Sequence, residues 1–204
     1  MAYLPAWEVQ RQIQAEVQSG ARDDTLVFVE HPSVLTLGAN FHEQNLLLTR
    51  EQYEARGIEV HRTDRGGDVT FHGPNQLVIY PIFDIRRHGK DLHRWLRDLE
   101  ETIIQVCSSY GLAGQRSSVN TGVWIRGKKV AAIGIKVSRW VSIHGIALNC
   151  NNDLSPFDLI VPCGIQTHGV TSLSVEAGGN VTIDDAKPRV VAAFESVFGL
   201  SITK

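Results

Sequence analysis

Apolar residues recur every three or four positions in several stretches of the chain, a spacing that places them on one face of a helix. Together with one shorter segment, this pattern predicts helices over residues 6–18, 50–55, 92–109 and 185–198. In the first helix, Val9, Ile13 and Val17 form the stripe that is expected to be buried. In the third, the apolar face is expected to begin at Leu92.

Short segments that read as strands lie between these helices. They cover residues 25–30, 34–37, 58–62, 76–80, 122–125, 130–137 and 142–149. Turns at 126–128 and 138–140 join the last three, so consecutive antiparallel hairpins are expected. Helices interspersed with hairpins favour an α/β fold of the α+β type, with helices packed on a mixed, largely antiparallel sheet. We expect a single domain over residues 1–204.

Composition narrows the class of protein further. The formal net charge of −2 argues against the broad basic surface that nucleic-acid binders use. No apolar stretch approaches the length of a membrane-spanning helix, and the first residues lack the regions of a secretory signal. Cys107, Cys150 and Cys163 are too few and too scattered for a disulfide framework. We therefore expect a cytoplasmic protein that binds neither nucleic acid nor a membrane.

The segment RGGDVTFHGP, residues 65–74, is the first candidate for chemistry. Its adjacent glycines, Gly66 and Gly67, let the backbone approach a ligand closely. It is not a nucleotide-binding P-loop, because no Gly-Lys-Ser/Thr follows. A tight turn between two strands is the alternative interpretation, but Arg65 before the glycines and His72 after them favour the wall of a pocket.

Two consecutive predicted strands carry small residues, in the segments 131–134 and 144–149. Such positions either admit a closely packed helix or leave room for a ligand, and the sequence alone does not separate these readings. At the hairpin tip before the first of these strands, Lys128 is expected to be solvated. Strand alternation can instead turn Lys129 toward a face of the sheet.

Cys163 lies between Pro162 and Gly164, in the stretch LSPFDLIVPCGI. A cysteine attacks as the thiolate, which a neighbouring cation favours. From the residues alone, a nucleophile and a structural thiol are equally good interpretations, since free cysteines are often simply buried. Cys107 in a predicted helix and Cys150 after a predicted strand are interpreted as structural. The histidines do not form the short-spaced pairs of a zinc site, so no metal is expected.

Several long motifs occur in an order that resembles the lipoyl(octanoyl) transferase family, within the superfamily of biotin and lipoate protein ligases. They are VFVEHPSVLTLG (27–38), RGGDVTFHGPNQLVIYP (65–81), GVWIRGKKVAAIGIKVSRWVSIHGIALNCNNDLSPFDLIVPCGI (122–165) and GVTSL (169–173). The resemblance covers nearly the whole chain. One departure is Asn75, which stands where the family usually has a glycine after His-Gly-Pro.

The resemblance implies a biotin/lipoyl protein ligase-like fold and a role for each of several residues. Cys163 would be the acyl-accepting nucleophile, and Lys129 would favour its thiolate and shuttle protons. The substrate pocket would be lined by Arg65, Gly66, Gly67, Asp68, Val69, Thr70, Phe71, His72, Ala132, Ile133, Gly134, Gly145, Ile146 and Ala147.

The implied reaction transfers an octanoyl group in two steps. Octanoyl-acyl carrier protein would acylate Cys163, and a lysine of a lipoyl domain would then take the acyl group as an amide. The acceptors would be the lipoyl domains of 2-oxoacid dehydrogenase E2 subunits and the glycine cleavage H protein. Because the donor is already a thioester, the resemblance implies no cofactor, no ATP and no metal.

Acyl carrier proteins are acidic, so basic residues on this chain are candidates for contacting them. The candidates are Arg86, Arg87, Lys90, Lys136 and Arg139. Each is equally typical of a solvated surface.

Two other functions stay open. An ATP-dependent lipoate or biotin ligase has the same fold, activates a free carboxylate and needs no cysteine nucleophile. A non-catalytic protein that binds acyl chains or lipoyl domains would show affinity without turnover. The pairing of Cys163 with Lys129 favours the transferase over both.

Overall fold

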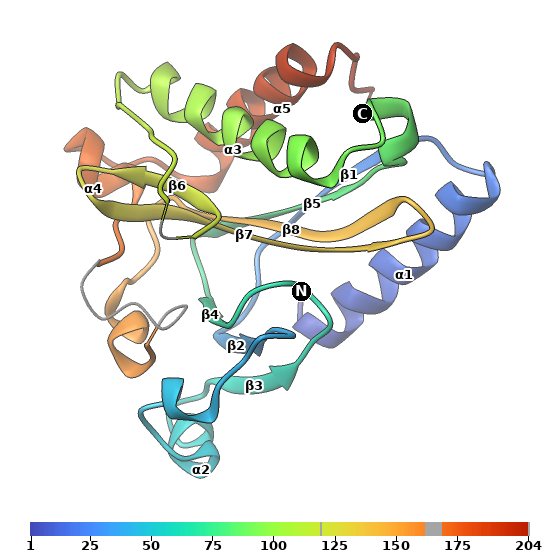
Figure 1. The fold of residues 1–204 in the computed structure, drawn as a ribbon. Coiled ribbons are helices and arrows are strands. Elements are labelled where there is room, and N and C mark those ends of the chain that lie inside the picture. Colours follow the sequence, from blue (N-terminus) through green and yellow to red (C-terminus); the bar gives the residue numbers. More distant parts are fainter. Residues whose placement is uncertain (119, 162–168, 204) are drawn as a thin grey trace.

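A computed structural model describes residues 1–118, 120–161 and 169–203 (Figure 1). The described helices are α1 (Tyr3–Ser19), α2 (Arg50–Glu54), α3 (Leu92–Ser109), α4 (Leu173–Ala177) and α5 (Ile183–Phe198), with short 3-10 helices at η1 (Glu43–Asn45), η2 (Ile85–His88) and η3 (Ser155–Leu159). The described strands are β1 (Thr25–Val29), β2 (Val34–Leu37), β3 (Glu59–Arg62), β4 (Val69–His72), β5 (Gln76–Ile82), β6 (Gly122–Ile125), β7 (Lys128–Ser138) and β8 (Val141–Asn149).

The strands form two sheets. The larger has the order β1-β5-β8-β7-β6, and each neighbouring pair in it is antiparallel. The smaller has the order β3-β2-β4, in which β2 pairs with β3 in parallel and with β4 antiparallel. This arrangement confirms the prediction of a mixed, largely antiparallel architecture with packed helices.

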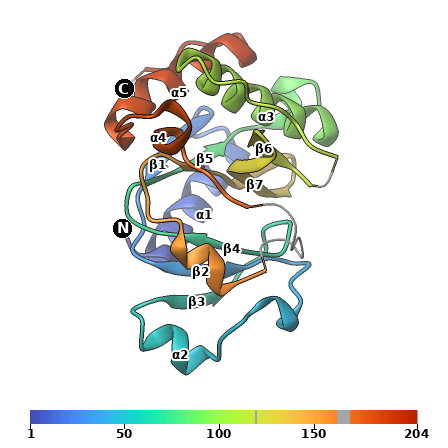
Figure 2. The same ribbon diagram turned by 90° about the vertical axis from the view of Figure 1, so that its left-hand side faces the viewer.

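The two faces of the large sheet are covered differently (Figures 1 and 2). Helices α3 and α5 pack on one face, where Leu99, Ile103 and Phe194 meet Ile79 and Leu148 in one continuous core. The opposite face meets α1 and the small sheet. Strand β5 is buried along its whole length, as expected for a strand covered on both faces.

The hairpins β6-β7 and β7-β8 confirm the prediction of consecutive antiparallel strands. Arg126 and Gly127 form the first tip with φ of 49° and 76°, and Arg139 and Trp140 form the second with φ of 48° and 69°. Two successive positive φ values give the turn whose twist matches that of the flanking strands. Lys128 belongs to β7 and not to the turn, and its side chain is exposed as expected.

Helix α1 is rotated relative to the predicted stripe. Ile13 and Val17 are buried, but Val9 is 40% exposed and Gln10 is fully buried in its place. The reason is a hydrogen bond, because Gln10 Oε1 accepts from the backbone N–H of His144 at 2.8 Å. A polar residue therefore takes a core position that the apolar pattern assigned to its neighbour.

Two other details of the prediction were wrong. Leu92 is 43% exposed, because as the first residue of α3 it precedes the packed face of the helix. Residues 69–72, taken as part of a loop, form β4 and pair with β2. Four residues between the Gly66–Gly67 pair and Gly73 are too few to show a strand period clearly.

Asn75, the departure from the family pattern, has a φ of 63°. This is the left-handed region that glycine adopts freely and that asparagine tolerates better than most residues. Its backbone N–H donates to Glu30 Oε1 at 2.7 Å. The turn between β4 and β5 is therefore kept despite the substitution.

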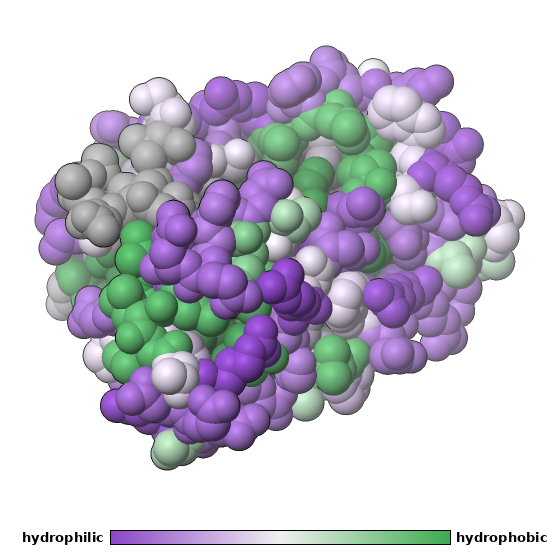
Figure 3. Space-filling model, turned by 60° about the horizontal axis from the view of Figure 1, so that its bottom comes forward, coloured by the Kyte–Doolittle hydropathy of each residue, from purple (hydrophilic) through white to green (hydrophobic). Residues whose placement is uncertain are grey.

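Polar side chains cover most of the face shown in Figure 3, and apolar side chains gather in separate areas between them. Within the described ranges, every helix falls short of what crossing a lipid bilayer requires in length or apolar character.

Candidate active site

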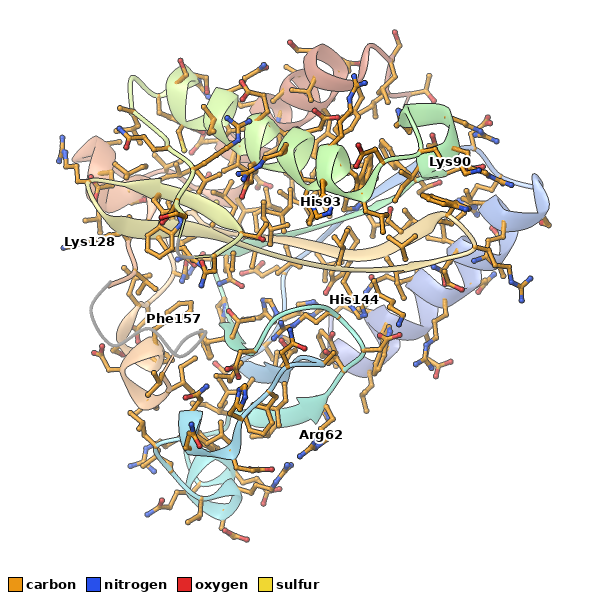
Figure 4. All side chains as sticks on the ribbon, in the orientation of Figure 1. Arg62, Lys90, His93, Lys128, His144 and Phe157 are labelled. Carbon is orange, nitrogen blue, oxygen red and sulfur yellow. The ribbon has the colours of Figure 1, made fainter. Side chains whose placement is uncertain are left out.

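A cavity lies between the two sheets, on the face of the large sheet opposite α3 and α5. Its walls come from β5, β7 and β8, from β4 with the preceding Gly66–Gly67 turn, and from Tyr3 in α1. The space measures about 520 Å³ with its open mouth included. Figure 4 shows His144 between the sheets, away from the end where Lys128 and Phe157 lie.

Three predicted segments meet in this cavity although they are far apart in sequence. The predicted pocket residues that line it are Arg65, Gly66, Gly67, Val69, Thr70, His72, Ala132, Ile133, Gly134, Gly145, Ile146 and Ala147.

Asp68 and Phe71 were predicted to line the pocket but are not among its lining residues. The Asp68 carboxylate accepts hydrogen bonds from Asn45 Nδ2 at 2.5 Å and from the backbone of Val69 at 2.7 Å. Phe71 alternates with the cavity-lining residues of β4, and its ring packs edge-on against Phe157 with centroids 5.6 Å apart. Asp68 precedes β4 and is held by these hydrogen bonds, and Phe71 belongs to the core of the small sheet.

The small residues of β7 and β8 serve two purposes. Ala132 and Ala147 line the cavity and leave it open. At Gly134, by contrast, a Cβ atom would lie 2.8 Å from the backbone oxygen of Gly66. Gly66 itself donates its N–H to the Ile135 oxygen at 2.8 Å. The glycine-rich turn therefore closes against β7 only because residue 134 has no side chain.

Arg65 holds this turn in place from inside the molecule. Its guanidinium is buried and donates to the backbone oxygens of Thr36 at 2.5 Å and Asp68 at 2.7 Å. It also donates to Thr36 Oγ1 at 3.1 Å and to the Gly66 oxygen at 3.0 Å. Several donors of one rigid group thus fix the backbone that forms the cavity wall.

Lys129 lies at the other end of the same wall and is 9% exposed. Its Nζ donates to Asn120 Oδ1 at 2.5 Å and lies 4.9 Å from the ring centroid of Trp124. The Lys129 backbone N–H donates to the Gly169 oxygen at 3.0 Å, and its oxygen accepts from Thr171 N–H at 2.9 Å. The amine is therefore held inward by an acceptor and an aromatic face.

A second cavity of about 330 Å³ adjoins the first and shares Thr70, Lys129, Ala132 and Ala147 with it. Its remaining lining residues are Gln76, Asn149, Phe157 and Val170. Lys129 therefore stands where the two spaces meet.

Cys163 lies in the stretch 162–168, outside the residues that the structure describes, so its predicted role stays a prediction. The described residues on either side are both anchored. Val161 donates its N–H to the Asn45 oxygen at 2.8 Å, and the Gly169 oxygen accepts from Lys129 as given above. Gly169, the first described residue after this stretch, is thus hydrogen-bonded to the backbone of the residue that carries the amine.

The end of the cavity nearest α1 is lined by tyrosine and histidine side chains. Tyr3 Oη lies 3.5 Å from Nδ1 of His144, whose Nε2 lies 2.7 Å from the Asp64 carboxylate. A carboxylate only accepts, so Nε2 of His144 is the donor and Nδ1 is left to accept from Tyr3. Tyr80 completes this end, and its hydroxyl is 2.8 Å from Nε2 of His31.

Burial keeps these groups neutral at pH 7. It raises the pKa of Tyr3 to about 12 and that of Tyr80 well above its ordinary value. It lowers the pKa of His72 to about 3 and also depresses the pKa of His31 and His144. Removal from water disfavours the charged form of either residue type.

The sequence analysis did not assign five of the lining residues, Tyr3, Val78, Tyr80, Thr121 and His144. Val78 and Tyr80 share one face of β5, and period-two alternation along that strand was the available signal. His144 is the first residue of the second small-residue segment, but it was not predicted to line the pocket. No sequence signal pointed to Tyr3, which reaches the cavity through the packing of α1 against β5 and β8.

The other two cysteines have the structural character that was expected of them. Cys107 and Cys150 are fully buried, and burial raises the pKa of each thiol to about 12. Among the described residues, no group of three or more histidine, cysteine or acidic side chains is placed to hold a metal ion.

The five basic residues considered for carrier contact do not gather at Lys129. Arg86 is bound by Asp84 at 2.7 Å. Lys136 is seven positions from Lys129 along β7, about 23 Å at the usual rise of a strand. These side chains therefore belong to the opposite end of the large sheet.

Comparison with known proteins agrees with this geometry. Residues 2–195 match the family model described as the lipoyl protein ligase A/B catalytic domain. An octanoyltransferase of Chloroflexus aggregans is 46% identical over 201 residues, covering 97% of this chain and 91% of the relative. An octanoyltransferase of Thermosynechococcus vestitus is 49% identical over 201 residues, covering 97% and 86%.

A solved structure shares the fold at much lower identity. The crystal structure of lipoate-protein ligase A bound with ATP superposes with a TM-score of 0.75 at 13% identity, covering 96% of this chain and 83% of that one. The match of nearly the whole chain to the family model, with relatives near half identity, settles its membership. The chain belongs to the lipoyl protein ligase A/B catalytic domain family.

Proposed function

We propose that this protein transfers an octanoyl group from a carrier-bound thioester to a lysine of lipoyl domains, through a thioester on Cys163. The observation that carries the proposal is the position of Lys129. Its buried amine stands where two cavities meet, on a strand position bonded to Gly169, at one end of the stretch that holds Cys163. The relatives named octanoyltransferases support the same activity.

The first half-reaction acylates the enzyme. The Cys163 thiolate attacks the thioester carbonyl, the bond from carbon to the carrier sulfur breaks, and the carrier leaves as a thiol after taking a proton. A cation beside Cys163 favours its thiolate, and Lys129 supplies that cation. Lys129 is also the proposed source of the leaving thiol's proton.

The second half-reaction forms the amide. The ε-amine of the acceptor lysine attacks the Cys163 thioester, the carbon–sulfur bond breaks, and the sulfur leaves as the thiolate. The attacking nitrogen must lose a proton, which Lys129 accepts after having given one up in the first step. The enzyme ends the cycle in its starting protonation state.

The first cavity suits the acyl chain. Val78, Ala132, Ile146 and Ala147 give it apolar walls, and burial of methylene groups there stabilises the bound chain by about 0.8 kcal/mol each. The donor is proposed to be octanoyl-acyl carrier protein. The proposed acceptors are the lipoyl domains of 2-oxoacid dehydrogenase E2 subunits and the glycine cleavage H protein, in the cytoplasm.

Intact-protein mass spectrometry tests the proposal. Incubation with octanoyl-acyl carrier protein, without nucleotide, should add one octanoyl group, and the adduct should move to an added lipoyl domain. The Cys163→Ser variant should acquire no thioester, whereas the control Cys107→Ala should acquire it as the wild type does. A strict ATP requirement would favour the ligase instead, and acyl binding with no adduct at all would favour a binding protein.

A further inference from the structure

The cavity has one chemically distinct end. From Lys129 it runs along β7, past the register shift at Val130 and past Ala132, to Gly134. There the backbone bond from Gly66 to Ile135 closes it from one side. Tyr3 from α1 and His144 from β8 line the same end. Val78, Ala132, Ile133 and Ala147 give the walls before this point apolar stretches, whereas Tyr3 and His144 make the end aromatic and polar.

His144 is held in one orientation by contacts from several elements. Its φ of 58° lies in the left-handed region, which is rare for residues other than glycine and requires support from the surroundings. Gln10 of α1 accepts from its backbone N–H at 2.8 Å, and Asp64 accepts from its ring at 2.7 Å. The ring therefore has little freedom to move aside for a ligand.

Tyr3 is held equally firmly. Its side chain is 2% exposed and packs against the ring of His31, with centroids 5.5 Å apart. His31 in turn is fixed between the Met1 oxygen and the Tyr80 hydroxyl, each at 2.8 Å from a ring nitrogen. The two tyrosines and the two histidines thus brace one another.

These contacts have opposite consequences for short and long acyl chains. Each methylene buried along the aliphatic walls strengthens binding about fourfold. A chain that reaches Tyr3 and His144 must displace a braced ring or separate hydrogen-bonded groups. Leaving one buried polar group without its partner weakens binding about fivefold to 150-fold. Affinity should therefore rise with chain length, reach a maximum and then fall.

We infer that Tyr3 and His144, braced by Gln10, Asp64 and His31, form an end wall that sets the upper limit of acyl chain length. This inference rests on the proposed function in taking an acyl chain as the occupant of the cavity. It assigns the limit to side chains at the end of the cavity remote from Lys129. These side chains are specificity-determining residues and take no part in the chemistry.

Binding of free fatty acids tests the wall without requiring turnover. Calorimetric titration of octanoate, decanoate and dodecanoate should give the wild type a maximum of affinity followed by a fall. Tyr3→Leu shortens the wall and should raise the ratio of decanoate to octanoate affinity about tenfold, because the two added methylenes find room. Tyr80→Leu opens the same end from β5 and repeats the test if Tyr3→Leu does not fold.

Trp7→Leu is the matched control. Trp7 lies one turn after Tyr3 on α1 and contacts the ring of His144 at 5.5 Å between centroids, but it does not line the cavity. The Trp7→Leu variant should show the same preference among fatty-acid chain lengths as the wild type. Unbroken growth of affinity through dodecanoate in the wild type, or an unchanged preference in the folded tyrosine variants, would overturn the inference. Acyl loading of Cys163 is measured separately, so failure of the proposed function is recognised independently.

Discussion

Lys129 and His144 are both buried and both line the same cavity, but they are positioned by different means. The Lys129 amine is held by Asn120 and the face of Trp124, beside a strand position that anchors residues 169–171. His144 is neutral and is locked by Gln10 and Asp64 on a left-handed backbone. The Lys129 amine, which can carry a proton, thus lies at the end of the cavity where acyl transfer is proposed. Neutral side chains lie at the end where the acyl chain is proposed to stop.

This difference matters because burying an ionised side chain and burying a neutral one have different free-energy costs. Burial penalises an ionised group strongly and a hydrogen-bonded neutral group only slightly. An end wall of neutral rings therefore excludes extra length without placing an unpaired charge beside an apolar chain. Variants at the two ends should accordingly fail in different ways, one set in rate and the other in selectivity or stability.

The largest effect is expected at Lys129. Lys129→Met should slow acylation of Cys163 about 100- to 10,000-fold, the usual contribution of a proton-transfer group, with little change in melting temperature. Lys129→Arg should not restore the rate, because a guanidinium keeps its proton. Quenched-flow mass spectrometry of the acyl-enzyme measures both. Lys128→Ala is the control, and a Lys129→Met rate within threefold of the wild type would remove this amine from the chemistry.

The next largest effect is expected on the stability of the fold, at Arg65, which holds the Gly66–Gly67 turn of the cavity wall. Arg65→Met should lower the free energy of unfolding by about 3 kcal/mol, because it leaves buried carbonyl oxygens without donors. For a chain of this size the melting temperature should fall by about 6–12 °C. Differential scanning calorimetry measures the loss. Arg62→Met, at an exposed arginine paired with an exposed Glu43, should change stability by less than 1 kcal/mol.

Acid should lower the stability of the fold through the buried histidines at the end of the cavity nearest α1. The folded state holds His72 neutral with a pKa of about 3, whereas an unfolded histidine is protonated below a pH of about 6.5. The unfolded state then binds more protons, so stability falls as the pH drops below 6.5. His72 alone should cost about 2 kcal/mol between pH 7.5 and pH 5.

Urea unfolding at the two pH values measures this loss. His72→Gln should lose correspondingly less stability on acidification than the wild type, whatever its stability at pH 7.5. The exposed His93→Gln serves as the control and should keep the wild-type dependence. Equal pH dependence of His72→Gln and the wild type would show that His72 is not held neutral in the fold.

The sequence predicted most of the elements and both hairpins because long periodic segments and glycine turns carry local signals. The errors occurred where a tertiary contact overrides the local pattern. Gln10 replaces Val9 in the core only because His144 needs an acceptor for its backbone. Strand β4 exists because β2 pairs with it, and nothing within residues 69–72 distinguishes that strand from a loop.

The candidate site divides in the same way. The glycine-rich segment, Lys129 and the small residues of two strands were singled out by residue type and spacing, and the family resemblance gave them their roles in the site. The end wall does not, because Tyr3, His31 and Tyr80 come from separate elements and meet His144 only after folding. Asp68 and Phe71 were included because their segment was read as a continuous wall. Phe71 instead packs in the core of the small sheet, and the Asp68 carboxylate is held by Asn45 and the backbone of Val69.

The smallest expected effect is on the rate, at Asn120. It tests most directly how the Lys129 end of the cavity is positioned. Asn120 Oδ1 accepts a hydrogen bond from the Lys129 amine at 2.5 Å. A hydrogen bond to a charged partner contributes about 1.5–3 kcal/mol, part of which the aromatic face of Trp124 retains. Asn120→Ala should therefore lower kcat about tenfold and leave KM for the acyl donor unchanged, because Asn120 does not line the acyl cavity.

The conservative variant separates positioning from packing. Asn120→Asp keeps an acceptor oxygen of the same reach and should recover part of the lost rate, whereas a residue that only fills space gains nothing from an oxygen. Ser118→Ala, at an exposed neighbour two positions earlier, should match the wild type. Steady-state kinetics of octanoyl transfer decide the matter. A raised KM with unchanged kcat would mean that Asn120 binds the donor and that Trp124 and the β7 backbone suffice to hold the amine.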